Sequence, residues 1–352
     1  MNKINSFFKE NHEYISSLNN NNNSVLIKKK SFFLKLSIVF KNLIDLLKFL
    51  LKFKHSKIIF TTPNITSYEN FFKDRCLKNT SVLNYHTTKI INTFSGQKVY
   101  NIGFFAKFFN DKFLKRNKSA STFRFYNLLL NFINYDEIFI PCYYDEVTSN
   151  LIFICNKKKI TEIQHGSIIN FFPYSRPSPI KLVDEIFVNN IQTKNYLEEH
   201  LYKDFKVNVI LKNDIKLNPV KFSKLKENLI LYCSSIEVNG IHPVLYNFLQ
   251  NHNLFKLRIR MHPRETSKKI FSDQLNSVNI NYDFDEFNDW KDNLNNYNLT
   301  VVTPWSSIAE ESTDLSIKTI IIDKIGRDRF KHLIDDNICM YSNDLKNILN
   351  EK

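Results

Sequence analysis

Three short polar clusters carry side chains that can act on anions or protons. They are QHGS at 164–167, RMHPRE at 260–265 and TPWSSIAEES at 303–312. Each follows directly on an apolar, β-branched run that predicts a strand. Binding sites of doubly wound parallel sheets are built at the carboxyl ends of strands, so this placement favours ligand binding.

In the first cluster, His165 is a hydrogen-bonding group or a base near neutral pH. Gly166 lets the chain turn sharply and bring its backbone close to a ligand. The plainer interpretation is a histidine at a strand end, satisfied by neighbouring backbone. Position alone favours the functional interpretation by a small margin.

The second cluster ends an alternating strand, which puts Arg258, Arg260 and His262 on one side. Pro263 ends the strand and fixes its exit direction, and Arg264 follows it. Imidazole and guanidinium groups together suit a phosphate or a carboxylate. A solvated, charged strand face is the plainer interpretation. It explains Arg258 better than it explains a histidine followed by a rigid proline.

In the third cluster, Ser306 or Ser307 is a natural N-cap for a following helix. Free backbone N–H groups and a hydroxyl at a helix N-terminus bind phosphate. Glu310 and Glu311 lie one turn further on, where either can accept hydrogen bonds from ribose hydroxyls. An ordinary cap with acidic first-turn residues explains this cluster equally well when it is taken alone. The order of all three clusters along the chain favours a binding site.

The elements that must position these clusters alternate between strand and helix. Strands are predicted at 57–63, 136–143, 160–164, 185–190, 228–235, 255–263, 299–304 and 318–323. Helices are predicted at 119–135, 145–157, 192–201, 243–251, 286–296 and 307–314. This pattern predicts an α/β protein with parallel sheets that are covered on both faces.

A chain of 352 residues predicts two domains. We place the linker in the polar, lysine-rich stretch 212–227. The predicted parts are a tail with a basic amphipathic helix at 1–56 and two Rossmann-like domains at 57–215 and 216–352, whose roles as acceptor domain and nucleotide-sugar domain are implied only by the family resemblance described below.

The segment 28–57 has apolar residues at helical spacing, interrupted by lysines and one aspartate. Its apolar runs are too short to cross a bilayer. One interpretation is a basic amphipathic helix on an anionic inner leaflet. The other is a helix packed on its own domain with a lysine-rich outer face. The preceding residues 1–23 are polar and predict a loose tail.

Composition narrows the function classes. The net charge of +14 suits nucleic acid, anionic lipid or an anionic substrate. Only five glycines are present and no glycine-rich phosphate loop occurs. The five cysteines form no C-x-x-C pair, so the sequence indicates neither zinc nor disulfides but a reducing cytoplasm. The lysines are dispersed and no nucleic-acid-binding signature occurs, so no nucleic-acid partner is expected.

The His-Pro and Ser-Ser pairs, each after a predicted strand, resemble the HP and SS motifs of bacterial GT-B sialyltransferases and polysialyltransferases. The sequence is also similar to CDP-glycerol glycerophosphotransferases. The segment WSSIAEES looks like a segment of the GT-B-fold UDP-N-acetylglucosamine 2-epimerases. The resemblance covers roughly 136–323 through short motifs. It implies a GT-B fold, with two Rossmann-like domains facing a cleft. It also implies that His262, Ser306 and Ser307 hold the phosphates of a nucleotide, and that Glu310 or Glu311 holds its ribose.

One departure concerns the catalytic base. The sialyltransferases carry an acidic pair followed by glycine, and the nearest match here is Asp145-Glu146-Val147. Because the glycine is missing, the base stays open between Asp145, Glu146 and His165. The departure also weakens the case for sialic acid in particular.

We therefore expect a glycosyltransferase at the inner face of the plasma membrane. It would be inverting and independent of metal and cofactor. The favoured donor is a CMP-activated sialic acid or related nonulosonic acid, and the acceptor is a surface polysaccharide, lipopolysaccharide or lipid-linked glycan. The alternatives are a CDP-polyol phosphotransferase, a transferase of UDP- or dTDP-sugars, and an inactive scaffold. A D-x-D sequence at 283–287 is expected to open an acidic, solvated helix.

Overall fold

The computed structural model describes most of the chain, and all structural statements below concern these residues. They are 2–20, 32–52, 55–62, 71–72, 79–86, 90–103, 106, 118–155, 157–164, 166, 168–212, 227–235, 238, 240–251, 256–262, 267–278, 280–287, 290–313 and 315–349.

The chain divides into two compact units. Unit 1 comprises Met1–His165 and Phe172–Lys212, and unit 2 comprises Gly166–Phe171 and Asn213–Lys352. The predicted boundary at 215/216 lies outside the described residues. Residues 1–56, predicted as a separate part, belong to unit 1, and the short segment Gly166–Phe171 belongs to unit 2.

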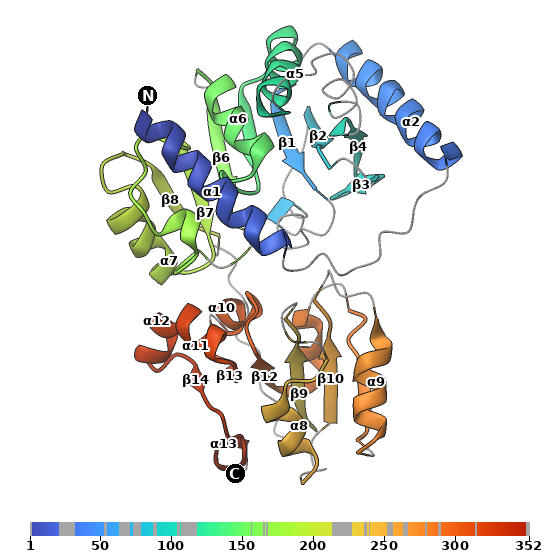
Figure 1. Cartoon of the computed structure of the whole chain (residues 1–352), viewed down its shortest axis with the longest axis vertical. Helices are drawn as coiled ribbons and strands as arrows, with labels where there is room; N and C mark the ends of the chain where they lie inside the picture. Colours follow the sequence, from blue (N-terminus) through green and yellow to red (C-terminus); the bar gives the residue numbers. More distant parts are fainter. Residues whose placement is uncertain are drawn as a thin grey trace. The chain divides into compact units, whose positions relative to one another are not determined.

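Unit 1 is built on an eight-stranded sheet with the order β3-β4-β2-β1-β5-β6-β7-β8 (Figure 1). All neighbouring strands are parallel except β3 and β4. The strands are β1 (Lys57–Thr61), β2 (Thr80–Asn84), β3 (Thr93–Phe94), β4 (Gln97–Asn101), β5 (Glu137–Ile140), β6 (Lys159–Ile163), β7 (Glu185–Val188) and β8 (Asn208–Leu211). Aromatic and aliphatic side chains of β1, β2, β4, β5 and β6 form a buried core between the sheet and its covering segments.

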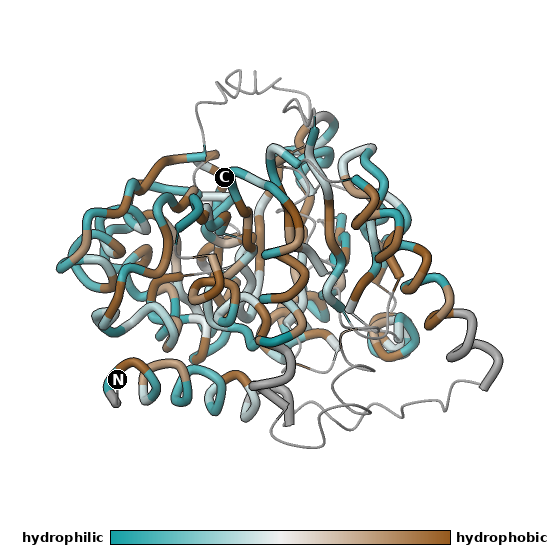
Figure 2. Tube along the Cα trace, turned by 90° about the horizontal axis from the view of Figure 1, so that it is seen from above, coloured by the Kyte–Doolittle hydropathy of each residue, from teal (hydrophilic) through white to brown (hydrophobic). Residues whose placement is uncertain are grey.

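Helices cover this sheet. They are α1 (Asn2–Asn20), α2 (Phe32–Leu51), α5 (Lys118–Phe132), α6 (Glu146–Ile154), η1 (Phe172–Tyr174), α7 (Ile191–Tyr196) and η2 (Leu197–Leu201). The predicted loose tail at 1–23 is wrong over α1, which alternates hydrophobic and hydrophilic turns from the point marked N (Figure 2). Phe7 and Phe8 are buried. Arg176 donates to Phe7 O at 3.3 Å and Asn11 Oδ1 at 2.9 Å and pairs with Glu10, which fixes α1 to the unit.

Unit 2 is built on a six-stranded parallel sheet with the order β11-β10-β9-β12-β13-β14 (Figure 1). The strands are β9 (Glu227–Cys233), β10 (Lys256–Arg260), β11 (Tyr282–Phe284), β12 (Tyr297–Thr303), β13 (Lys318–Ile321) and β14 (Met340–Tyr341). Its helices are α8 (Pro243–Leu249), α9 (Lys268–Asn276), η3 (Trp290–Asn295), α10 (Ile308–Thr313), α11 (Lys324–Arg329), α12 (Lys331–Asp335) and α13 (Lys346–Leu349).

Both faces of the unit 2 sheet are covered. Side chains of α8, α9 and α13 join one buried cluster with strand residues such as Ile230 and Ile259. The residues of opposite pleat, such as Leu229 and Leu231, form a second cluster with η3 and α10. The predicted α/β class with two Rossmann-like domains, the domain composition of the GT-B fold, is therefore confirmed.

The prediction for 283–287 is wrong. Asp283 lies in β11, an edge strand that was not predicted from the sequence, and the described residues 283–287 do not open a helix. Of the helix predicted at 286–296, the described residues form only the short 3₁₀ turn η3. Both aspartates face arginines of β10: Asp283 lies 3.8 Å from Arg258, and Asp285 lies 2.6 Å from Arg260.

Candidate functional site

Each sheet has a point where the strand order reverses, and ligands of open α/β sheets bind there, outside the carboxyl ends of the strands. In unit 2 the chain runs outward from β9 through β10 to β11, and then outward from β12 through β13 to β14. The reversal therefore lies between β9 and β12. In unit 1 the same reasoning places the reversal between β1 and β5.

Two serines follow β9 at the unit 2 reversal, where the sequence predicted only the end of a strand. Ser234 Oγ accepts a hydrogen bond from His262 N at 2.8 Å, and Ser234 N donates to Arg260 O at 3.0 Å. These bonds fix the exit of β10 against β9. Ser235 is fully buried, and its hydroxyl has no hydrogen-bond partner among the described residues. Serine directly after a buried central strand was the available sequence signal.

The predicted phosphate-binding residues come to this edge from two strands. His262 follows β10, and Ser306 and Ser307 follow β12. Because β10 and β12 flank β9, their axes lie about 10 Å apart at the usual strand spacing. Thr303 Oγ1 donates to Cys233 O at 2.8 Å and joins the ends of β9 and β12. The topology thus brings the His262 and Ser306–Ser307 segments to one edge.

The serines at the start of α10 differ in their contacts. Ser306 Oγ accepts a weak hydrogen bond from Ile308 N at 3.4 Å, in the manner of an N-cap. Within the described part of the chain, no hydrogen bond involves the Ser307 hydroxyl, whereas its carbonyl accepts from Glu310 N and Glu311 N. The Ser307 hydroxyl therefore remains available to a ligand.

Other predicted residues of this unit are held by protein partners. Arg260 Nη1 donates to Asp285 Oδ2 at 2.6 Å and to Phe287 O at 3.1 Å, which draws it toward β11. Glu311 accepts a hydrogen bond from the Trp290 indole at 2.9 Å, and Glu310 is fully buried. Pro263 and Arg264 lie outside the described residues. Ligand roles for these residues stay predictions.

Arg329 is a further cation near this edge that the sequence analysis missed. Its guanidinium lies 4.0 Å from the ring centroid of Trp305, the residue before Ser306. Gly326 permits the approach of α11, because a Cβ at this glycine would lie 1.9 Å from Pro304 O. No hydrogen bond or ion pair involves the Arg329 guanidinium among the described residues. A partly buried, unpaired arginine is a ready partner for a phosphate or carboxylate.

In unit 1, Asp145 follows β5 at the reversal and caps α6. Its Oδ1 accepts from Val147 N at 2.8 Å and Thr148 N at 2.9 Å, and its Oδ2 accepts from Tyr85 Oη at 2.6 Å. A carboxylate used in this way holds the fold of the loop. Glu146 is exposed, and its carboxylate has no hydrogen bond or ion pair in the described part of the chain.

The carboxyl end of β6 lies beside the carboxyl end of β5, because these strands are neighbours in the sheet. Gln164, directly after β6, accepts a hydrogen bond from Asn189 N at 2.8 Å. His165 and Ser167 lie outside the described residues. A Cβ at Gly166 would meet no atom within 4 Å, so no close packing requires a glycine there.

A buried acid lies near the carboxyl end of β6. Glu162 is fully buried in β6 and accepts a hydrogen bond from Tyr174 Oη. Its second oxygen and the nearby Tyr202 hydroxyl have no partner among the described residues. Burial raises the pKa of Glu162 to about 8. This carboxyl group therefore keeps a proton at neutral pH.

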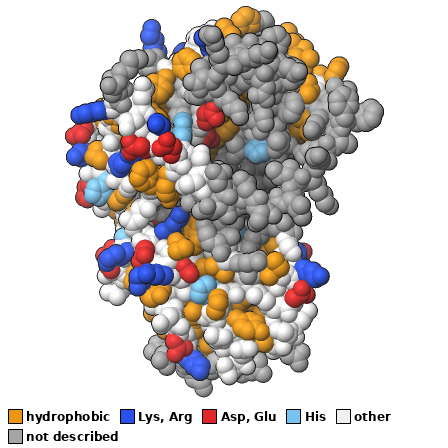
Figure 3. Space-filling view, in the orientation of Figure 1, with side chains coloured by type: hydrophobic (Ala, Val, Ile, Leu, Met, Phe, Trp, Pro, Cys, Tyr) orange, Lys and Arg blue, Asp and Glu red, His pale blue; other side chains and the backbone are white. Residues whose placement is uncertain are grey.

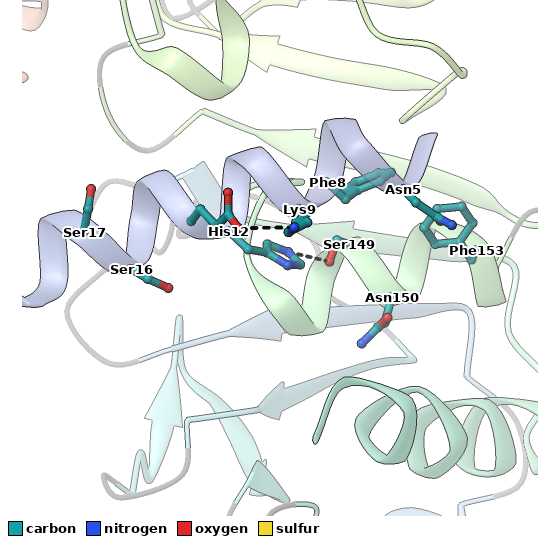
Figure 4. A pocket seen from close by; sticks show the side chains of 10 residues that line it. Asn5, Phe8, Lys9, His12, Ser16, Ser17, Ser149, Asn150 and Phe153 are labelled. Carbon is teal, nitrogen blue, oxygen red and sulfur yellow. Dashed lines mark hydrogen bonds and ion pairs between the residues drawn. The ribbon is translucent and has the colours of Figure 1, made fainter. Parts of the chain in front are cut away.

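A groove with a volume of about 590 Å³ lies between α1 and α6 of unit 1 (Figure 4). His12 points toward Ser149, with 3.2 Å between Nε2 and Oγ. Phe8 and Phe153 meet edge-to-face with their centroids 5.2 Å apart, and Phe153 is partly exposed. Asn150 lines the groove, and its buried Nδ2 has no hydrogen-bond partner within the described part of the chain. An exposed aromatic ring among amide and hydroxyl groups is able to bind a sugar.

Within the described residues, no group of three or more histidine, cysteine, aspartate or glutamate side chains is arranged to hold a metal ion.

No protein-family model matches the sequence, and no curated protein matches it. Several solved structures are similar in fold. The UDP-GlcNAc 2-epimerase of Neisseria meningitidis, bound to UDP-GlcNAc, has a TM-score of 0.48 at 14% identity, covering 77% of this chain and 83% of that chain. The lipopolysaccharide outer core galactosyltransferase WaaB has a TM-score of 0.44 at 11% identity, covering 82% and 93%. The wall teichoic acid polymerase TagF, soaked with CDPG, has a TM-score of 0.42 at 11% identity, covering 83% and 79%. All three scores are below 0.5, so the fold assignment rests on the topology of the two sheets.

Proposed function

We propose that this chain is a glycosyltransferase that transfers a sugar from a nucleotide-activated donor to a glycan acceptor. The observation that carries the proposal is the set of anion-binding groups at the reversal of the unit 2 sheet. The Ser235 and Ser307 hydroxyls have no hydrogen-bond partner among the described residues, and the Arg329 guanidinium stacks on Trp305 without a hydrogen bond or ion pair among them. A phosphate group would satisfy such donors.

In this proposal unit 2 holds the donor. His262, Ser306 and Ser307 bind its phosphate, together with Arg329, and Glu310 or Glu311 binds its ribose. These groups stabilise the charge that develops on the leaving phosphate as the bond to the anomeric carbon breaks. Arg260 contributes only if its pair with Asp285 opens.

In the same proposal, unit 1 binds the acceptor and provides the catalytic base. Glu146 or His165 takes the proton of the acceptor hydroxyl as its oxygen attacks the anomeric carbon. Glu146 is favoured over Asp145, since Asp145 is occupied as a cap. A single displacement inverts the anomeric configuration. The groove between α1 and α6, with Asn150 and Phe153, suits the distal sugars of a polymeric acceptor.

The identity of the donor is the most specific part of the proposal. A CMP-linked nonulosonic acid is favoured by the resemblance of the His-Pro and Ser-Ser pairs to sialyltransferase motifs. A CDP-polyol phosphotransferase is the alternative, since it needs the same phosphate site but transfers a phosphoryl-linked polyol and releases CMP. A transferase using UDP- or dTDP-sugars would release the nucleoside diphosphate instead.

We place the enzyme at the inner face of the plasma membrane, where lipid-linked acceptors are available. None of the described helices is long and apolar enough to cross a bilayer. The basic segment 28–57 supports attachment to the surface.

A thermal-shift panel of cytidine, uridine and thymidine nucleotides tests the proposal, because a ligand that binds only the folded state raises the melting temperature. We expect stabilisation by a cytidine nucleotide and a smaller effect in His262→Ala. Release of nucleotide from CMP-, CDP-, UDP- and dTDP-linked donors then separates the reaction classes. Equal responses to every nucleotide, or none, together with no donor turnover would overturn the assignment.

A further inference from the structure

Helix α2 has an inner face that fixes it to unit 1. Ile38, Asn42, Leu46 and Phe49 are buried, and α2 packs beside β4. The Phe49 ring lies 4.6 Å from the ring centroid of His55. The helix therefore cannot leave the sheet without exposing a packed face, and it is held along the surface of the unit.

The outer face of α2 is apolar, whereas the packed-helix interpretation of the sequence predicted a lysine-rich outer face. Phe40 is 63%, Ile44 42%, Leu47 52% and Leu51 73% exposed. Their spacing of four, three and four residues places them in one stripe along the helix. Hydrophobic side chains are visible at the surface over the upper right of unit 1, where α2 runs (Figure 3). A continuous exposed apolar stripe on a helix marks an interaction surface.

The sequence around the stripe carries almost only positive charge. Within 28–57 there are nine lysines, namely Lys28, Lys29, Lys30, Lys35, Lys41, Lys48, Lys52, Lys54 and Lys57. The single acidic residue of this segment, Asp45, is buried and accepts from Asn101 N and Nδ2, both at 3.1 Å. Lys48 is exposed beside Leu47. The one negative charge is thus turned inward, and the outer face presents apolar groups beside the exposed Lys48. Lys41 and Lys52 instead donate hydrogen bonds to Asn92 Oδ1 and Ser81 Oγ.

We infer that α2 docks unit 1 on an anionic lipid bilayer, with its stripe in the interface. Phe40, Ile44, Leu47 and Leu51 enter the boundary between headgroups and acyl chains, and Lys48 contacts anionic headgroups. Because the opposite face is packed on β4, the helix lies in the membrane plane. This inference deepens the membrane placement within the proposed function and depends on none of its chemistry.

Cosedimentation of the full chain with vesicles tests the inference. The probes are vesicles of phosphatidylglycerol with phosphatidylcholine, and of phosphatidylcholine alone. We expect binding to the anionic vesicles that weakens with added salt. The double variant Phe40→Glu with Leu47→Glu is expected to bind roughly tenfold or more weakly, since it removes two inserted groups and adds negative charge.

The matched control is Ile325→Glu with Met340→Glu in unit 2. These side chains are 49% and 45% exposed, so the control makes the same change of charge at comparable exposure. It is expected to keep the wild-type vesicle affinity. All four substitutions are at the surface, and unchanged melting temperatures in both variants would establish that each folds.

Three results would overturn the inference. One is equal vesicle binding by wild type and the α2 variant. The second is equal binding to neutral and anionic vesicles. The third is self-association of the wild-type chain in the absence of lipid, lost in the α2 variant. That result would mean that the stripe binds a second copy of the chain. Nucleotide stabilisation of both variants is measured in parallel. Loss of vesicle binding with nucleotide stabilisation intact separates this surface from the donor site.

Discussion

The buried acid Glu162 makes the stability of unit 1 fall as pH rises, opposite to the effect of a carboxylate whose pKa is lowered by an ion pair in the folded state. Burial raises its pKa from 4.5 to about 8. Between these values the folded chain keeps a proton that the unfolded chain releases. The free energy of unfolding therefore falls as pH rises, with a slope of up to about 1.4 kcal/mol per pH unit. The stabilisation is complete below about pH 4.5 and is lost as pH rises through about 8.

Two histidines restrict the range in which this slope can be seen. Burial lowers the pKa of both His55 and His332 to about 4, so each is neutral in the folded chain. Below the usual histidine pKa of 6.5 the unfolded chain binds the extra protons, so stability falls with falling pH there and offsets the slope from Glu162. Above 6.5 the histidines of the unfolded chain lose their protons as well, so this offset fades over about one pH unit. The window from pH 6.5 to about 8 therefore shows the Glu162 slope best, and comparison with a variant that lacks only this carboxylate cancels the remaining histidine contribution.

The informative variant is Glu162→Gln, which keeps an oxygen acceptor for Tyr174 Oη but does not titrate. The wild type is expected to lose roughly 2 kcal/mol of unfolding free energy across the window relative to this variant. For a unit of this size that is a shift of roughly 4–8 °C in melting temperature. Circular-dichroism melts of both proteins at matched ionic strength measure it. Parallel profiles for the two proteins would refute the argument and mean that Glu162 is ionised in the folded state.

Two further changes test the site. Asp145→Asn keeps a capping acceptor and is expected to retain donor turnover, whereas Glu146→Gln is expected to lower turnover by roughly 10²–10⁴; the reverse result would move the base to Asp145, and full activity in both would leave it to His165. Arg329→Met is expected to weaken the binding of a nucleoside diphosphate by roughly tenfold or more, because a charge-assisted hydrogen bond to phosphate is lost. Binding of the nucleoside without phosphate is expected to stay unchanged. Arg327→Met on the same helix is the control, and equal losses in both would contradict a specific role.

The strands that the sequence predicted are those with continuous apolar runs. Runs such as 57–63 and 299–304 became β1 and β12 because both faces of a parallel sheet are buried. β2 was missed because its buried residues include Thr80, Ser81 and Asn84. The polarity of Ser81 and Asn84 is offset by partners elsewhere along the chain. For example, Asn84 Nδ2 donates to Asn101 Oδ1 at 2.8 Å. The local sequence pattern does not predict such pairs.

The location of the candidate site followed from strand ends, since parallel topology carries them to one edge. The state of each charged side chain did not follow. Arg260 looked available in the sequence, but β11 brings Asp285 to it at 2.6 Å. Arg329 looked like an ordinary surface cation. It keeps its charge unpaired because the adjacent Asp328 pairs with Arg327 instead, at 3.1 Å. Which arginine can meet a phosphate is therefore decided by where the acidic partners lie in space, and sequence spacing does not give that information.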